Sequence, residues 1–318
     1  MTTEDVTTAA EPGAAAQERL RAFSILVERC LEATLPRAGQ LVLEPFAAAA
    51  LVDSMRYSLE TPGKRLRPML VLSAADAVGV DAARCARFAA GLEMIHAYSL
   101  VHDDLPAMDD DDLRRGRPTN HVVFGEGMAI LAGDGLLTQA IMVLLDPVVE
   151  TELQTSIVRE VVRAAGFEGM VGGQAADLLA QGRTPDEVLL RSMHARKTGA
   201  LISAATRAGA RLAGASVDDL AACTRFAQAY GVAFQIADDL KDEIAPEKVS
   251  GKRRGGDRAA GKMTYPAMFG IEGSRDRLRV ELAIAVEALA PLGARGAVLE
   301  ALARDSVAIA FTDHGSEL

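Results

Sequence analysis

Apolar residues recur with helical spacing along almost the whole chain, and this periodicity limits the fold to one built from α-helices. Alanine and leucine are abundant, alternating β-branched segments are few, and turn residues fall at intervals suited to helix ends. The sequence therefore predicts an all-α protein. Its expected helices are Ala15–Leu35, Leu41–Leu59, Arg67–Val78, Ala82–Asp103, Phe124–Leu145, Glu150–Ala165, Glu168–Leu179, Thr184–Leu212, Val217–Ile244, Tyr265–Ile271, Ser274–Leu292 and Ala294–Phe311.

The chain shows no internal division. No linker rich in proline, glycine and serine interrupts it and no period recurs, so one domain is expected over residues 15–318. Residues 1–14 are acidic and rich in small residues, and they are expected to form a disordered lead-in without the build of a signal peptide. The three cysteines are widely spaced in apolar helical patterns, which indicates reduced thiols in a cytoplasmic protein.

Charge and hydropathy exclude two classes of partner. The formal net charge is -10, so the chain lacks the basic field that nucleic acid or an anionic membrane surface requires. The most apolar long stretch, Met128–Val149, contains Asp134, Gln139 and Asp146, which would be costly in lipid. We therefore expect no nucleic-acid partner and no membrane insertion, and an anionic substrate would have to be held by local basic groups.

An acidic cluster follows the apolar helical segment Gly91–Val101. Two carboxylates ~6 Å apart at an effective dielectric of ~20 repel by roughly 3 kcal/mol, so the cluster must be well solvated or bind cations. A solvated acidic loop is the simpler interpretation, but the run continues a core helix and two arginines follow it at once. Oxygen ligands without cysteine or histidine spacing suit Mg²⁺ more than zinc. The aspartates are Asp103, Asp104, Asp109, Asp110, Asp111 and Asp112, and the arginines are Arg114 and Arg115.

A second acidic stripe lies in Phe234–Glu243. On a helix, Gln235, Asp238, Asp239 and Asp242 fall at i, i+3, i+4 and i+7 and share one face. An amphipathic surface helix gives the same spacing. Together with the first cluster, however, the stripe indicates two carboxylate faces that can hold metal ions between them.

Basic groups occur in two loops. Lys64 and Arg67 in the segment TPGKRLRP would face one side if that turn is helical, which suits a diphosphate, although a basic surface turn is the commoner case. His96 lies two helical turns before Asp103 on the same face, where it is either a core histidine or a ligand contact. In the loop of residues 251–266, Gly256–Lys262 nearly matches a phosphate-binding motif, but Met263 replaces the required hydroxyl and no strand precedes it, so a nucleoside triphosphatase is rejected.

Small and polar residues interrupt two other helices. Lys197, Thr198 and Gly199 lie in the middle of a helical pattern, and glycine costs ~1 kcal/mol there relative to alanine, so a local distortion is expected. Gly172 and Gly173 similarly indicate a close approach between helices.

Six motifs occur in an order that resembles the trans-isoprenyl diphosphate synthases, specifically the bacterial-type farnesyl and geranylgeranyl diphosphate synthases. They are GKRLRP, HDDLPAMDDDDLRRG, GGQAADL, KTGAL, DDLKD and GKMTYP. The resemblance implies a single-domain helical bundle of the isoprenoid synthase type, with the two aspartate motifs on opposite walls of a deep central cavity, and a homodimer. It also implies a Mg²⁺-dependent transfer that joins isopentenyl diphosphate to an allylic diphosphate.

The resemblance assigns roles residue by residue. Three Mg²⁺ ions with the substrate diphosphate would be held by Asp103, Asp104, Asp109, Asp238, Asp239 and Asp242. The allylic diphosphate would be held by Arg114, Lys197, Lys252 and Lys262. Isopentenyl diphosphate would be held by Lys64, Arg67, His96 and Arg115. The developing allylic cation would face Thr198 and Gln235.

Product length depends on the depth of the cavity. In this family an aromatic residue five positions before the first aspartate limits the product to fifteen carbons, and Tyr98 occupies that position, ~7.5 Å along the helix from Asp103. Ser99 adds little bulk. The expected product is therefore farnesyl diphosphate, with geranylgeranyl diphosphate (C20) as the alternative. A class I terpene cyclase and an inactive partner subunit are less favoured, because aromatic residues are only 4% of the chain and both aspartate motifs are intact.

Overall fold

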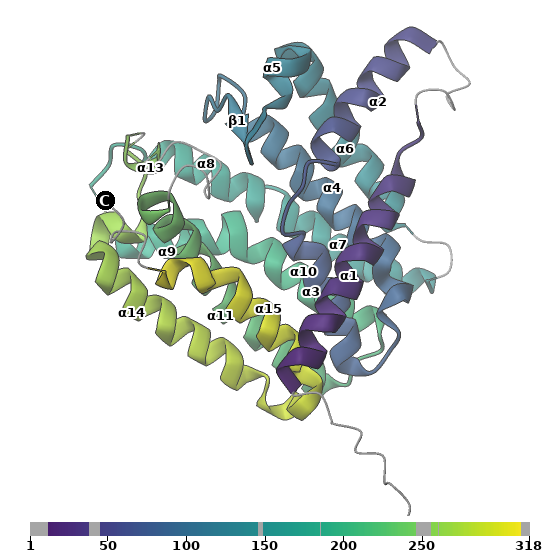
Figure 1. Ribbon diagram of the computed structural model, residues 1–318, viewed down its shortest axis with the longest axis vertical. Coiled ribbons are helices and arrows are strands. Elements are labelled where there is room, and N and C mark those ends of the chain that lie inside the picture. The colour runs from purple at the N-terminus through teal and green to yellow at the C-terminus, as the bar shows by residue number, and fades with distance from the viewer. Residues whose placement is uncertain are drawn as a thin grey trace, which may run out of the picture.

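The computed structural model describes residues 12–37, 45–145, 149–184, 186–245, 256–259 and 261–312. The α-helices in these ranges are α1 (Pro12–Thr34), α2 (Pro45–Leu59), α3 (Leu66–Val78), α4 (Ala86–Asp103), α5 (Asn120–Phe124), α6 (Glu126–Leu144), α7 (Thr151–Ala165), α8 (Met170–Ala180), α9 (Glu187–His194), α10 (Ala200–Leu212), α11 (Val217–Ile244), α13 (Gly256–Ala259), α14 (Tyr265–Ala288) and α15 (Ala297–Val307). Figure 1 shows them packed as a helical bundle. The all-α prediction is confirmed.

Helices α3, α4, α10 and α11 form the centre of the bundle. Almost every residue of α3 is buried, because α4, α10 and α15 pack around it. The approach of α10 to α3 requires a glycine: a Cβ atom at Gly209 would lie 2.1 Å from the carbonyl oxygen of Val71. Helix α11 packs along α14 on one side and α10 on the other, and α4 packs along α6 (Figure 1). Two of these central helices, α4 and α11, carry the two acidic motifs.

Several boundaries differ from the sequence prediction. The expected helix Thr184–Leu212 is divided into α9, a π-helical turn over Ala195–Gly199, and α10. The expected helix Phe124–Leu145 is preceded by α5 and begins only after Gly125, whose φ of 86° interrupts the helical path. The region predicted as two helices from Tyr265 forms α14, bent at Gly270, where φ is 68°. Two of these breaks lie at glycines with positive φ, Gly125 and Gly270, and the spacing of apolar residues does not reveal such a backbone conformation.

Further short elements complete the described chain. Turns of 3₁₀ helix cover Ala82–Cys85, Ala290–Gly296 and Ala308–Phe311. Two short strands, β1 (Leu113–Arg114) and β2 (Arg117–Pro118), form an antiparallel hairpin that the sequence did not predict. The two residues of the hairpin turn, Arg115 and Gly116, have φ of 53° and 76°, as a tight two-residue turn requires. The hairpin turns the chain back toward α4 after the first acidic motif.

One helix among the described residues, α6, is long and apolar enough to cross a membrane, and a second candidate arises only if α14 and the segment after it, bent by 88°, are counted as one span. Helix α6 packs against α4 and α2, and the amide of Gln139 donates to the carbonyl oxygen of Thr34 (3.3 Å). Its opposite face exposes Ile130, Leu131 and Met142. Burial on one side only is typical of a helix at an edge of a bundle, whereas apolar groups on its outer face are not.

Candidate active site

The first acidic motif lies at the C-terminal end of α4. Beyond the helix the chain folds back on it: the amide of Asp109 donates to the carbonyl oxygen of Asp103 (2.8 Å), and the amide of Asp111 donates to that of Asp104 (3.3 Å). Asp110 adopts a left-handed conformation (φ 52°), which aspartate tolerates better than most residues. This compact turn keeps Asp109 beside Asp103 although six positions separate them.

The carboxyl group of Asp103 has a strongly raised pKa. Burial, together with the charges of Asp109 and Asp104, raises it to about 6 against the lowering effect of Lys197 and Arg114. A carboxylate in such an environment gains from any cation that replaces its lost solvation.

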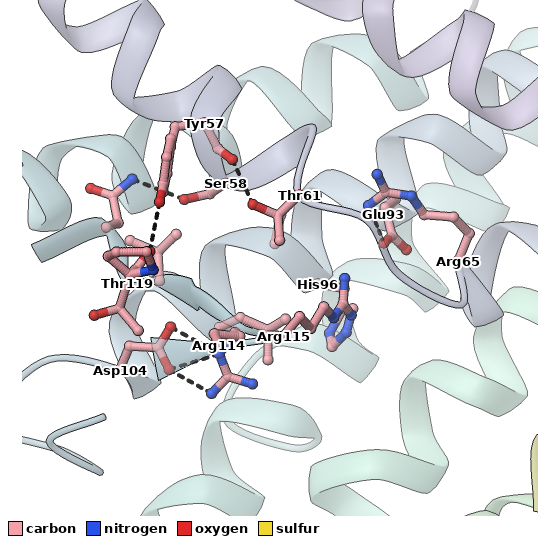
Figure 2. Close-up of a pocket in the computed structure, with 15 residues that line it drawn as sticks. Tyr57, Ser58, Thr61, Arg65, Glu93, His96, Asp104, Arg114, Arg115 and Thr119 are labelled. Carbon is pink, nitrogen blue, oxygen red and sulfur yellow. Dashed lines mark hydrogen bonds and ion pairs between the residues drawn. The ribbon is translucent and has the colours of Figure 1, made fainter. Parts of the chain in front are cut away.

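Asp104 is buried and already paired. Both of its carboxylate oxygens accept from Nε of Arg114 (2.7 and 2.9 Å), and Nη2 of Arg114 lies 2.5 Å from Oδ1 (Figure 2). Burial alone would lower the pKa of Arg114, but Asp104 raises it above its ordinary value. Asp104 therefore orients Arg114, and its predicted part in metal binding remains a prediction.

The second acidic motif lies on α11. Asp238 is exposed, whereas Asp239 is buried and accepts from Nε2 of Gln235 (2.8 Å) and from the backbone N–H of Tyr265 (2.9 Å). Burial raises the pKa of Asp239 well above its ordinary value. Asp242 accepts from the backbone N–H of Asp257 (3.2 Å). Asp239 thus holds the start of α14 against α11, and Asp238 is the most accessible acid of the three.

Lys262 joins the two acidic motifs. Its Nζ lies 3.1 Å from Oδ1 of Asp109 and 3.3 Å from Oδ1 of Asp257, the residue whose amide is bonded to Asp242. Burial lowers the pKa of Lys262, but Asp257, Asp109 and Asp177 outweigh it and raise the pKa above its ordinary value. Lys262 therefore contacts the first acidic motif directly and is linked to the second one through Asp257.

The π-helical turn between α9 and α10 lies on this same site. Lys197 donates to Oδ2 of Asp177 on α8 (2.5 Å), and the hydroxyl of Thr198 donates to Oε1 of Gln235 on α11 (2.5 Å). A Cβ atom at Gly173 would lie 2.3 Å from the backbone nitrogen of Lys197, so only glycine permits α8 to approach. The predicted distortion and the predicted close approach are both confirmed.

A pocket between α2, α4 and the β1–β2 hairpin carries the basic groups (Figure 2). Its lining includes Arg65, Glu93, His96, Arg114 and Arg115. Burial lowers the pKa of His96 well below its ordinary value, and four arginines lower it further, so the imidazole is neutral at pH 7. Such a pocket attracts an anion, to which a neutral imidazole can donate one N–H.

Arg67, the basic residue of α3, is buried, and burial lowers its pKa. Lys64 does not share a helical turn with it, because α3 begins only at Leu66. Instead Nζ of Lys64 donates to the backbone carbonyl of Ser306 (3.0 Å). Lys64 also interacts electrostatically with Lys241 and Asp238. A common face of Lys64 and Arg67 required a helical turn that includes both residues, and this condition is not met. Lys252 lies outside the described residues.

Tyr98 and Ser99 lie on α4 below Asp103. The Tyr98 side chain is buried, and its ring meets the edge of the His102 ring at a centroid distance of 5.9 Å. Nε2 of His102 is 3.0 Å from the carbonyl oxygen of Ile130 on α6. The Ser99 hydroxyl donates to the carbonyl oxygen of His96 (2.9 Å). Tyr98 is therefore a buried residue of α4 that packs on His102, which is in turn bonded to α6.

Sequence reasoning missed two charged residues of the site, Glu93 and Asp257, and it missed the pairing of Asp177 with Lys197. A signal existed for Glu93, a lone acid inside an apolar helical run, since such a residue is seldom buried without a partner. Asp257 lies in a loop of glycines and cations, where no periodicity marks it.

His194, beside the π-helical turn, gives a pH prediction. It is buried against Tyr265, and burial lowers its pKa to about 4. The unfolded state, with a pKa of about 6.5, binds more protons between these values, so stability falls as the pH falls from about 6.5 to 4. His194→Gln should reduce the loss of unfolding free energy between pH 7 and pH 5 by about 2 kcal/mol, measured by urea denaturation. A variant with the full wild-type pH dependence would contradict this assignment.

Comparison with known proteins identifies the family. The sequence matches the polyprenyl synthetase family over residues 48–289. It is 46% identical to farnesyl diphosphate synthase of Bacillus subtilis (strain 168) over 236 residues, 73% of this chain and 80% of that relative. It is 44% identical to geranylgeranyl pyrophosphate synthase 11 of Arabidopsis thaliana over 240 residues, 73% of this chain and 67% of that relative. An apo FPP/GFPP synthase structure from Zymomonas mobilis aligns with a TM-score of 0.80 at 32% identity, covering 93% of this chain and 99% of that one. The chain therefore belongs to the polyprenyl synthetase family.

Proposed function

We propose that this protein is a Mg²⁺-dependent trans-prenyltransferase that joins isopentenyl diphosphate to dimethylallyl or geranyl diphosphate and releases farnesyl diphosphate. The observation that carries the proposal is the link between the two acidic motifs: Lys262 contacts Asp109 of the first and is connected through Asp257 to Asp242 of the second. A basic pocket lies beside the first motif and supplies a second anion site.

The residues present fit Mg²⁺. No three acidic, imidazole or thiol groups among the described residues are clustered as a ready-made metal site. Mg²⁺ is usually bound through one or two carboxylates together with substrate phosphates rather than by an all-protein cage, so separate carboxylates facing a diphosphate site suit it. Asp103 at the end of α4 and Asp109 in the turn after it would hold Mg²⁺ from one side, with Asp104 assisting, and Asp238 would hold it from α11, supported by Asp239 and Asp242. The number of ions, three, is part of the proposal.

Cleavage of the allylic C–O bond would leave a highly charged diphosphate and a carbocation. Bound Mg²⁺ would neutralise charge on the leaving diphosphate. Lys197 and Lys262 lie beside the carboxylates and would bind the same group, as would Arg114, which Asp104 orients. Lys252 is assigned here on the resemblance alone. Thr198 and Gln235 are joined by a hydrogen bond, and their side-chain oxygen atoms would face the allylic cation.

The acceptor would bind in the basic pocket. His96 and Arg115, which line this pocket, would hold the diphosphate of isopentenyl diphosphate, with Lys64 approaching from the side of Ser306. Arg67, buried on α3, is added to them on the resemblance. After the new C–C bond forms, the acceptor carbon loses a proton to the departing diphosphate. No side chain is needed as a general base in this scheme.

The product is proposed to be farnesyl diphosphate because Tyr98 is buried on α4 below the first motif. Geranylgeranyl diphosphate remains the alternative, since relatives of both names are found at similar identity.

The remaining proposals concern assembly. We infer a homodimer that buries the exposed apolar residues of α5 and α6, including Val123, Leu131 and Met142. The protein is proposed to be cytoplasmic, with one polyprenyl synthase domain over 15–318 after a lead-in of residues 1–14. Helix α1 starts within that lead-in, at Pro12, and residues 1–11 lie outside the described ranges.

An elongation assay tests the activity. Purified protein with dimethylallyl diphosphate, labelled isopentenyl diphosphate and Mg²⁺ should yield mainly a C15 product, and an excess of EDTA should abolish it. Release of diphosphate from the allylic substrate without elongation would instead indicate a cyclase, and no turnover by the purified protein would indicate an inactive subunit.

A further inference from the structure

Arg65 occupies an unusual position between two residues of the anion site. It is the residue before α3, its side chain is buried, and its backbone is in the left-handed region, with φ 47° and ψ 37°. This conformation disfavours a side chain with a Cβ atom, so the surrounding contacts must hold it. The bend separates Lys64 from Arg67 and directs Lys64 toward Ser306.

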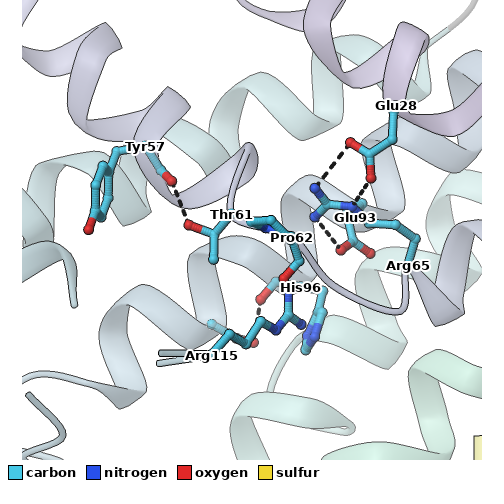
Figure 3. Close-up of polar contacts among 9 residues, drawn as sticks. Glu28, Tyr57, Thr61, Pro62, Arg65, Glu93, His96 and Arg115 are labelled. Carbon is cyan, nitrogen blue, oxygen red and sulfur yellow. Dashed lines mark hydrogen bonds and ion pairs between the residues drawn. The ribbon is translucent and has the colours of Figure 1, made fainter. Parts of the chain in front are cut away.

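The guanidinium group of Arg65 is fixed from two helices. Its Nε and Nη2 donate to Oε1 and Oε2 of Glu28 on α1 (2.7 and 3.2 Å), and its Nη1 donates to Oε1 of Glu93 on α4 (3.1 Å) (Figure 3). This two-oxygen contact with Glu28 is the geometry in which arginine binds a carboxylate best. Arg65 therefore fastens the start of α3 to both α1 and α4.

The loop that leads to Arg65 is held at two further points. The hydroxyl of Thr61 donates to the carbonyl oxygen of Tyr57 (2.7 Å), and Nη1 of Arg115 donates to the carbonyl oxygen of Pro62 (3.0 Å) (Figure 3). A Cβ atom at Gly63 would lie 1.9 Å from Nη1 of Arg115, so the loop rests directly on this guanidinium. The loop, the hairpin and α4 thus form one built pocket wall.

The contact with Arg65 keeps the Glu93 carboxylate from pairing with other arginines. It is almost fully buried, and only its Oε1 is bonded. Within the described ranges, three buried atoms lack a hydrogen-bond partner here: Oε2 of Glu93, Nε of Arg67 and Nδ1 of His96. The charge of Glu93 also acts on Arg67 and Arg115. Released from Arg65, the Glu93 carboxylate would pair with these arginines and compete with an incoming anion.

We propose that Arg65 is a positioning residue of the anion pocket, which fixes the bend between Lys64 and Arg67 and holds Glu93 through its Oε1, so that this carboxylate does not pair with the arginines that would bind a diphosphate. The proposal rests on the function proposed above, because it takes the ligand of the pocket to be isopentenyl diphosphate. Arg65 acts through its neighbours and need not touch the substrate.

A double-mutant cycle tests the proposal. Arg65→Met should raise the KM for isopentenyl diphosphate about 10- to 100-fold while the KM for the allylic diphosphate changes less than about threefold. Combining it with Glu93→Gln should recover at least about tenfold of that loss, because the competing carboxylate is gone. Arg65→Lys should recover part of it. The control is Arg19→Met, which removes another ion pair between α1 and α3, that with Asp76, away from the pocket.

Two results would overturn the inference: equal increases of both KM values, or a double variant no better than Arg65→Met. If Arg65→Met does not fold, Glu28→Gln serves instead, since it weakens the same contact from the half-exposed side, and an unchanged KM for isopentenyl diphosphate would count against the proposal. Calorimetric titration with isopentenyl diphosphate and no divalent ion tests the role of Arg65 separately from the proposed function. Wild-type binding that Arg65→Met weakens supports the inference even if the wild type does not elongate, which would defeat the proposed function alone.

Discussion

Asp103→Asn and Asp238→Asn should each lower kcat about 10³-fold or more while leaving the fold intact. Each change keeps the side-chain shape but removes a charge from one of the two acidic motifs, on α4 and α11 respectively. Electrostatic stabilisation of a leaving diphosphate depends on cations held from both sides, and loss of one charged ligand typically costs several kcal/mol of transition-state stabilisation. Steady-state rates at saturating Mg²⁺ would measure the effect.

Asp110→Asn is the matched control for these variants. Asp110 belongs to the same acidic run, but its side chain is exposed and its backbone is left-handed, a conformation that asparagine accepts well. Its kcat should stay within about threefold of wild type. A similar loss in all three variants would mean that the total negative charge matters, rather than the carboxylates assigned to the metal.

Tyr98→Ala should move the main product from C15 to C20 or longer. The Tyr98 ring is buried and packs on His102, which is tied to α6 through the carbonyl of Ile130. Removing the ring opens space ~7.5 Å along the helix from Asp103, where a growing chain would otherwise stop. Chromatography of labelled products after dephosphorylation gives the chain length directly.

Tyr98→Phe keeps the ring and should keep C15, and Ser99→Ala should do the same because the serine hydroxyl is bonded within its own helix. A wild type that makes mostly C20 would contradict the role of Tyr98 as the floor. Unchanged C15 from Tyr98→Ala would place the floor elsewhere.

The sequence predicted best those features that local signals control. Helix α11 matches its predicted limits, Val217–Ile244, because the hydroxyl of Ser216 caps its first turn through the amide of Asp219, and a proline follows soon after its end. The stripe of acids on that helix follows directly from the helical period.

The features that sequence could not predict depend on contacts between remote elements. The sequence predicted a distortion at Lys197–Gly199 and a close helix approach at Gly172 and Gly173, but a periodic pattern contains no information that these two segments contact each other. The direction of Lys64 follows from the left-handed Arg65, which is stabilised by Glu28 and Glu93 from two other helices. Spacing alone treats Lys64 and Arg67 as neighbours on one helix.

The central claim is that both acidic motifs act on one diphosphate through divalent ions. Calorimetric titration of a non-reacting allylic thiolodiphosphate, with and without Mg²⁺, tests it on the wild type, Asp103→Asn and Asp238→Asn. We expect Mg²⁺-dependent binding by the wild type that weakens about 100-fold or more in each single variant. Undiminished Mg²⁺-dependent binding by either variant would contradict the claim.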